Sequence, residues 1–171
     1  INSIKNYNML VNFESLDNSS RVWIFQANRE FLANETEIIT AKVEEFIAEW
    51  RRHGEDLKAS YIIKYNQFIV LSVDENYNGI SGCSIDASVN LMKIFESKFQ
   101  LDLTNKLNIS FRDASNINVV SLADFQKFAK EGKITAETIV FNNLVATKAD
   151  FETNWEVAAK NSWHNRFFTN I

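Results

Sequence analysis

Two apolar, β-prone segments are separated by only two residues, and this spacing constrains the fold more than any other feature of the sequence. Residues 61–65 (YIIKY) and 68–73 (FIVLSV) flank Asn66 and Gln67. A two-residue connection joins antiparallel strands, whereas a parallel crossover needs about a dozen residues or more. The sequence therefore predicts a β-hairpin here and excludes a purely parallel, doubly wound sheet.

The hairpin lies between further segments of strand and helix periodicity. Residues 22–25 form a continuous apolar run that predicts a buried strand, and a helix is expected over 35–52. After the hairpin, Ser84 is expected to cap a second helix. Residues 107–111 then alternate as a half-buried strand, with 117–120 as its partner. The order βαββαβ predicts an α+β fold with a ferredoxin-like core and one additional antiparallel strand.

The C-terminal third contains two further helix starts. Ser121 and Thr147 each stand three residues before an Asp, which is the spacing of a capping box. Gly132 is expected to end the first of these helices, and residues 138–141 to form a strand. The expected organisation has three parts within one compact unit: an N-terminal tail (1–19), a ferredoxin-like core (20–115) and a C-terminal α/β lobe packed on the core (116–171).

Composition excludes several classes of protein. A formal net charge of -4 and a pI near 5.3 disfavour nucleic acid as a partner. No apolar run approaches the roughly 20 residues needed to cross a bilayer, so no membrane insertion is expected. A single cysteine closes no internal disulfide, and the first twenty residues lack the pattern of a secretory signal. A cytoplasmic location is therefore expected.

The stretch NGISGCSIDASV, residues 78–89, holds the only cysteine at the expected start of the second helix. Backbone N–H groups at a helix start lower the pKa of a thiol. Cys83 is therefore a candidate nucleophile, with His53 as its base and Asp86 or Asp56 as an orienting carboxylate. The alternative is structural, because a lone cysteine is more often a small buried hydrophobe and the two charged residues suit helix ends.

The predicted topology gathers several candidate side chains at one edge. In βαββαβ order, the loop after the first helix and the loop before the second leave from the same end of the sheet, whereas Asn28 and Asn66 belong at the other. The candidates at this edge are His53, Asp56, Asp74, Glu75, Cys83, Ser84 and Asp86. A helix start beside them predicts an anion site or an activated thiol; two solvated loops are the alternative.

Trp163 and His164 are separate candidates for ligand binding near the C-terminus. They predict an aromatic pocket, or alternatively a histidine that anchors the end of the chain. No metal site is predicted, because the two histidines of the chain lack a cysteine or carboxylate at ligand spacing. No cofactor is expected either, because the sequence has neither a G-x-x-x-x-G-K-[ST] phosphate loop nor a G-x-G-x-x-G segment.

The chain resembles a small family of uncharacterised bacterial proteins over residues 20–168. The resemblance rests on six segments in this order: SRVWIFQANREF, HGEDLKASYIIKYNQFIVLSVDE, GCSID, ETIVFNNLVATKADF, NWEV and SWHNRFF. Members of that family are often labelled ABC transporter ATPase, but the resemblance implies no established activity or catalytic residue. The label conflicts with this sequence, which lacks the Walker A motif. A second segment, SLADFQKFAKEGKITAETIVF, is similar to GYF-like interaction modules, which implies a docking role for the C-terminal lobe.

Three functions follow from these observations. The favoured hypothesis is a binding or accessory domain without catalytic activity, whose partner is a small molecule or a protein. The alternative is a cysteine-dependent enzyme or thiol sensor that uses Cys83. The third is the ABC-type ATPase of the family label, which the missing phosphate loop disfavours.

Overall fold

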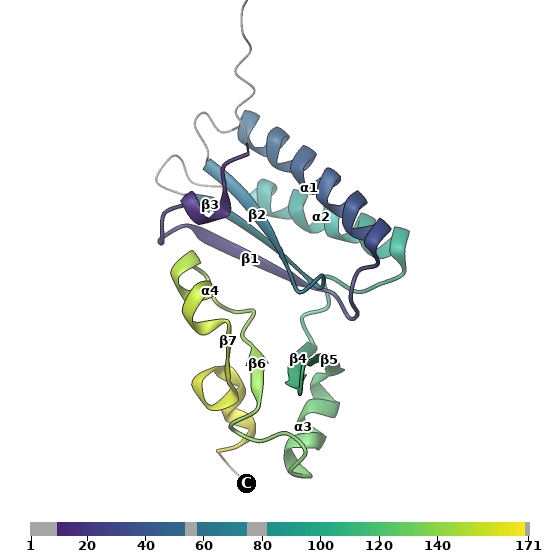
Figure 1. Ribbon diagram of the computed structural model, residues 1–171, viewed down its shortest axis with the longest axis vertical. Helices are drawn as coiled ribbons and strands as arrows, with labels where there is room; N and C mark the ends of the chain where they lie inside the picture. The colour runs from purple at the N-terminus through teal and green to yellow at the C-terminus, as the bar shows by residue number, and fades with distance from the viewer. Residues whose placement is uncertain (1–9, 54–57, 75–81, 170–171) are drawn as a thin grey trace, which may run out of the picture.

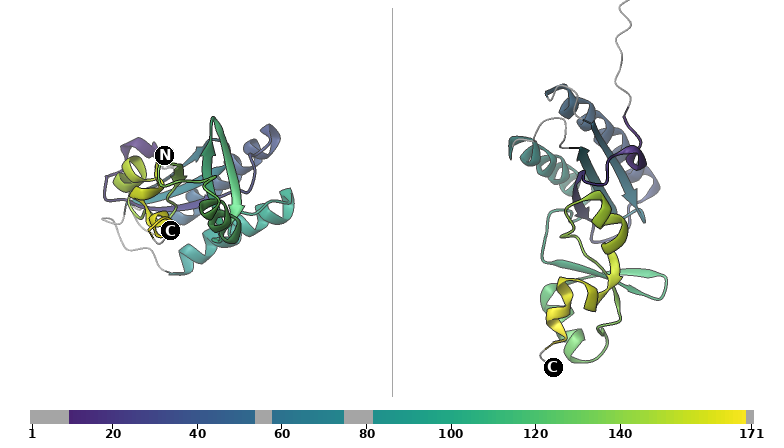
Figure 2. Two further views of the ribbon diagram at one scale, coloured as in Figure 1. Left: turned by 90° about the horizontal axis from the view of Figure 1, so that it is seen from below. Right: turned by 90° about the vertical axis from the view of Figure 1, so that its left-hand side faces the viewer.

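The computed structural model describes residues 10–53, 58–74 and 82–169, and of residues 51–53 and 82–84 it describes the backbone alone. The chain is an α+β protein with two antiparallel sheets, as the sequence predicts at that level. The first sheet and its two helices lie at one end of the long axis, and the second sheet with its helices lies at the other (Figures 1 and 2).

The first sheet has three strands in the order β1-β3-β2, namely β1 (Arg21–Gln26), β2 (Lys58–Lys64) and β3 (Phe68–Asp74). Strands β2 and β3 pair antiparallel from Lys58↔Asp74 to Lys64↔Phe68, so the predicted hairpin is confirmed. Its turn has positive φ at Tyr65 and Asn66, 54° and 49°. Asparagine tolerates this left-handed conformation better than most residues, which helps to fix the tight reversal.

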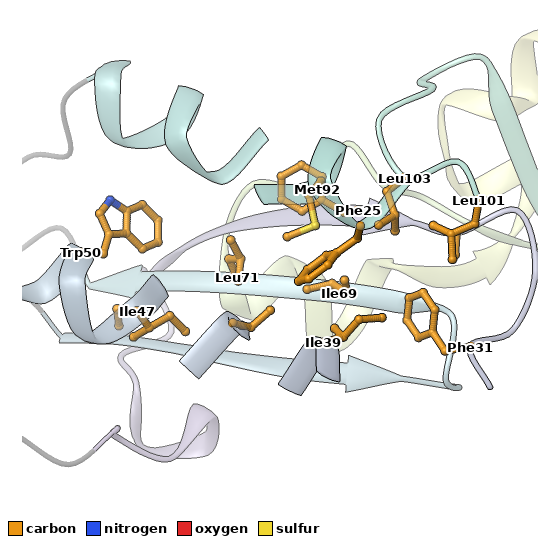
Figure 3. Close-up of a cluster of buried hydrophobic side chains, with 14 of the residues drawn as sticks. Phe25, Phe31, Ile39, Ile47, Trp50, Ile69, Leu71, Met92, Leu101 and Leu103 are labelled. Carbon is orange, nitrogen blue, oxygen red and sulfur yellow. The ribbon is translucent and has the colours of Figure 1, made fainter. Parts of the chain in front are cut away.

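Helices α1 (Ala33–His53) and α2 (Gly82–Phe99) cover one face of the first sheet (Figure 1). In α1, Ile39, Val43 and Ile47 recur every four residues and are completely buried, because that spacing places them on one stripe of the helix. They pack on Ile69 and Leu71 of β3 within the main hydrophobic cluster (Figure 3). Each such side chain contributes about 1.5–3 kcal/mol relative to an exposed one.

The second sheet has the order β5-β4-β6-β7. Its strands are β4 (Asn108–Asp113), β5 (Asn116–Ser121), β6 (Ile139–Phe141) and β7 (Glu156–Ala158), with helices α3 (Leu122–Lys130) and α4 (Lys148–Asn154) between them. Both predicted caps are present: Ser121 Oγ accepts from the N–H of Asp124, and Thr147 Oγ1 from that of Asp150. Gly132 follows α3 with φ 74°, which suits a helix end.

The expected fourth strand of the ferredoxin-like sheet lies elsewhere, which corrects the predicted core. Strand β4 pairs with β5, as predicted, but its other neighbour is β6 and not β1. The period-two pattern of β4 buries Ile109 against the second sheet's own cluster, with Phe125, Ile134 and Val140. The predicted alternation is only partly followed, because Leu107 is 63% exposed and Ser110 is buried, and alternation in any case does not specify which sheet buries a strand.

The connection from α2 to β4 directs the chain away from the edge of β1. The Glu96 carboxylate accepts hydrogen bonds from the N–H groups of Leu103 and Thr104, at 2.7 and 2.8 Å. Asn28, just after β1, exchanges two hydrogen bonds with Asp102. These contacts hold the connection across the end of β1, so that β4 starts in the second sheet.

Residues before β1, expected as an N-terminal tail, pack on the first sheet from Leu10 onward. Phe13 and Leu16 are buried, and the short 3-10 helix Phe13–Ser15 lies against β2. Lys148 ties this segment to the second sheet's helices, because its buried ammonium group donates to the carbonyl oxygens of Glu14 and Leu16 at 3.0 and 2.9 Å. Residues 10–20 therefore belong to the folded unit.

The two sheets meet through a cluster on the helix-free face of the first sheet. Val22, Phe68 and Val70 alternate with the residues that face the helices, and they pack against Phe141 and Trp155. The rings of Phe68 and Trp155 meet edge to face with centroids 4.9 Å apart. This packing fixes the second sheet against the first and leaves the edge of β1 beside it.

Candidate functional site

A cavity of about 290 Å³ lies along the edge of β1 that no strand of the first sheet covers. Its walls come from both sheets and from the chain between them. They comprise residues 22–26 of β1, 85 and 89 of α2, 103–106 of the connection, 108–110 of β4, 141 at the end of β6, 143 and 144 after it, and 163–164 near the C-terminus. The cavity therefore exists because β4 leaves the first sheet.

The side-chain amide of Gln26 organises the polar part of the cavity wall. Its oxygen accepts from the hydroxyl of Ser110 and from the amide of Asn143, the latter at 2.9 Å, and its nitrogen donates to the Asn108 carbonyl at 3.3 Å. Trp155 Nε1 in turn donates to Asn143 Oδ1 at 2.9 Å. Because Gln26 is buried and makes three hydrogen bonds to the second sheet and its connections, this network links β1 to the second sheet and orients its polar groups.

His164 lies in the same wall as a neutral, buried side chain. Only 1% of the residue is exposed, its ring stacks on Trp163 with centroids 4.0 Å apart, and Nδ1 lies 2.6 Å from Ser162 Oγ. Burial, with a smaller contribution from the positive charge of Arg166, lowers the pKa of His164 to about 4. Near neutral pH the ring therefore offers a hydrogen-bonding nitrogen without a positive charge.

A second polar cluster braces the two sheets beyond the cavity. Glu156 of β7 accepts from Arg112 Nε and from the Tyr65 hydroxyl, the latter at 2.5 Å. Burial raises the pKa of Glu156, but the hydrogen bonds from Arg112 and Tyr65 outweigh it and leave that pKa below its usual value. The Arg112 guanidinium also lies 4.7 Å from the centre of the Tyr65 ring. This cluster connects the β2–β3 turn to the second sheet.

The candidates predicted at one end of the first sheet, around the loop after α1 and the loop before α2, lie partly outside the described residues. Lys58 and Asp74 are register partners, so both loops leave from the same end of the first sheet, as predicted. Asp74 is buried and Asp86 is exposed on α2. Of the other candidates, the backbones of His53, Cys83 and Ser84 lie at the end of α1 and in the first turn of α2, whereas Asp56 and Glu75 lie outside the described residues. The proposed thiol site stays a prediction.

The structure places Trp163 and His164 in the cavity wall; the sequence left them either as lining an aromatic pocket or as an anchor for the end of the chain. The network of Gln26, Ser110 and Asn143 was not predicted. The only signal for it in the sequence was Gln26, a polar residue directly after the apolar run VWIF. A polar residue at the end of a buried strand is a candidate for a buried hydrogen-bonding group. Within the ranges that the structure describes, no group of three His, Cys, Asp or Glu side chains is arranged to hold a metal.

Comparisons with protein-family models, with curated proteins and with solved structures found no match for this chain. Among the described residues, no helix has both the length and the apolar character needed to span a membrane.

Proposed function

We propose that this chain is a binding or accessory domain without catalytic activity, and that its ligand occupies the cavity beside β1. The cavity itself is the observation that carries the proposal. Its volume of about 290 Å³ is close to the lower end of ligand pockets, which is roughly 300 Å³. Apolar side chains and a few fixed polar groups share its wall, as in most binding sites.

The chemistry of the described polar groups in the wall also supports binding. The Ser110 hydroxyl donates to the amide oxygen of Gln26, which is not a base. His164 is held neutral, and its Nδ1 is engaged with the hydroxyl of Ser162, which also accepts from the backbone N–H of His164 as the cap of a short helix. These groups are arranged to orient a ligand through hydrogen bonds.

Two further observations support the same class of function. Residues 121–141 resemble GYF-like interaction modules, and this segment forms α3, the turn at Gly132 and β6, whose last residue, Phe141, lines the cavity. The order β1-β3-β2, with both helices on one face, is what remains of a ferredoxin-like sheet when the fourth strand is removed. We therefore regard the first sheet as a ferredoxin-like unit modified to open a binding edge.

A fragment screen by ligand-observed NMR tests this proposal. The Val89→Trp variant fills the cavity from α2, because Val89 lines it, and Ile94→Trp is the matched control, because Ile94 lies on the same helix and is 61% exposed. We expect fragments that bind the wild type and the control but not Val89→Trp, with all three proteins unfolding at similar temperatures. If no fragment distinguishes the two variants, the cavity is not the binding site.

A further inference from the structure

The open edge of β1 has a defined hydrogen-bonding pattern. The N–H of Val22 donates to the carbonyl of Ala146 at 2.9 Å, on the side away from β3. In an antiparallel pair, the backbone groups of alternate residues point to the same side of the strand. Ile24 and Gln26 therefore present their N–H and C=O groups on the side of Val22, where the cavity lies.

These backbone groups are paired at both ends of the cavity but not within it. Beyond Gln26, the N–H of Asn28 donates to the Asp102 carbonyl at 3.3 Å. Ile24 and Gln26 lie between these two paired points. Within residues 10–53, 58–74 and 82–169, no protein group pairs with the outward N–H and C=O of Ile24 or with the outward N–H of Gln26. Such groups at a strand edge are a template for another strand.

The chain itself begins a fourth strand at this edge and then leaves it. Arg21 and Thr147 form an antiparallel bridge, and Ala146 makes the next contact with β1. The turn that precedes Ala146, closed by the hydrogen bond from Val145 N–H to Asn142 O, brings the chain to this edge from β6. Strand pairing at the fourth position is therefore already present at Arg21 and stops where the cavity begins.

We infer that an extended peptide segment of a partner protein continues this pairing and adds to β1 as the fourth strand of the first sheet. This inference rests on the proposed function and names its ligand class. The open stretch from Val22 to Gln26 spans about 13 Å, since a strand rises roughly 3.3 Å per residue, so about four residues of the partner pair with it.

The walls on the two sides of the edge define the side chains of this segment. Successive side chains of the added strand point to opposite faces. The side chains on one face of the added strand meet Ile85 and Val89 of α2. Those on the other face meet Phe141 and Leu144, which lie at and after the end of β6. The segment is therefore apolar and β-prone.

A pooled peptide library tests the inference. Each acetylated and amidated hexapeptide carries Lys at both ends and a mixture of Val, Ile, Leu, Phe and Thr at the four central positions. Peptides retained by the wild type, by Val89→Trp and by Ile94→Trp are identified by mass spectrometry. The best binder is then resynthesised with N-methyl groups on alternate residues, which removes the N–H donors for one side and keeps the side chains.

We expect enrichment on the wild type and on Ile94→Trp but not on Val89→Trp. N-methylation on the pairing side weakens binding roughly tenfold or more, because two backbone hydrogen bonds are lost, whereas N-methylation on the other side has a smaller effect. Binding also shifts the amide NMR signals of Ile24 and Gln26 downfield.

Four results overturn the inference. Equal affinity of both N-methylated forms shows that apolar contact alone binds the peptide. Concentration-dependent self-association that protects the Ile24 amide from exchange shows that a second copy is the occupant. Fragments that bind the cavity while no peptide is enriched refute the added strand but leave the proposed function intact; if neither fragments nor peptides bind, both proposals fail.

Discussion

Acidification is expected to destabilise the protein through His164 before its carboxylates are protonated. The ring is buried in the cavity wall against Trp163 and Phe125, and its pKa is lowered to about 4. In the unfolded chain the same ring titrates near 6.5. Below about pH 6.5 the unfolded state therefore takes up a proton that the folded state does not. Stability is fully present above that pH and is lost as the pH falls toward about 4.

The two pKa values give the size of the effect. Between about pH 7.5 and pH 5, linkage with a folded pKa of about 4 and an unfolded value of 6.5 predicts a loss of about 2 kcal/mol in the free energy of unfolding. Most side chains of Asp and Glu titrate below this window, near 4. Urea unfolding followed by tryptophan fluorescence, at several pH values across the window, measures the loss.

Two variants isolate the contribution of this ring. His164→Gln removes the titrating group, so its stability is expected to stay nearly constant over the same window. His53→Gln removes the only other histidine and serves as the matched control, which is expected to retain the loss seen in the wild type. A difference below about 0.5 kcal/mol between wild type and His164→Gln, or an NMR titration of the ring near 6.5, would refute the reasoning.

Three further outcomes are expected. Lys148→Met removes the charged donor to the carbonyls of Glu14 and Leu16 and is expected to lower the free energy of unfolding by about 1.5–3 kcal/mol in urea denaturation. Lys160→Met is the control and is expected to be nearly neutral in the same assay, because the ion pair of Lys160 is exposed. Iodoacetamide is expected to alkylate Cys83 no faster in the folded protein than in urea; a folded-state rate more than about tenfold higher favours the thiol enzyme or sensor. Mg-ATP at millimolar concentration is expected to leave the unfolding temperature unchanged, and a clear rise would reveal a nucleotide site.

Local physics made much of the fold predictable. The two-residue connection specifies the β2–β3 hairpin, and the apolar stripe of Ile39, Val43 and Ile47 specifies α1. The hydroxyls of Ser121 and Thr147 begin α3 and α4, because a cap depends only on residues within one turn. In each case the decisive contacts lie within a few positions of one another along the chain.

The partner of β4 was not predictable in this way. The alternating pattern of β4 does not distinguish between the two sheets. Which sheet it joins depends on the Glu96 carboxylate, which lies in α2, and on Asn28, which follows β1 and is distant from β4 in sequence. The cavity follows from that choice. Trp163 and His164 were named as candidates because aromatic and imidazole groups stand out in a sequence, whereas Gln26 acquires its role only through Ser110 and Asn143, 84 and 117 positions away.

The helix-free face of the first sheet has a consequence for synthesis on the ribosome. The apolar face formed by Val22, Phe68 and Val70 has been synthesised once β3 has emerged from the ribosome. Phe151, one of the residues that cover this face, lies 77 positions after Asp74. At roughly 5–20 residues per second, this face stays uncovered for about 4–15 s of elongation. The nascent chain therefore carries an apolar surface that needs protection from aggregation until its C-terminal third arrives, and a truncated message leaves that surface permanently exposed.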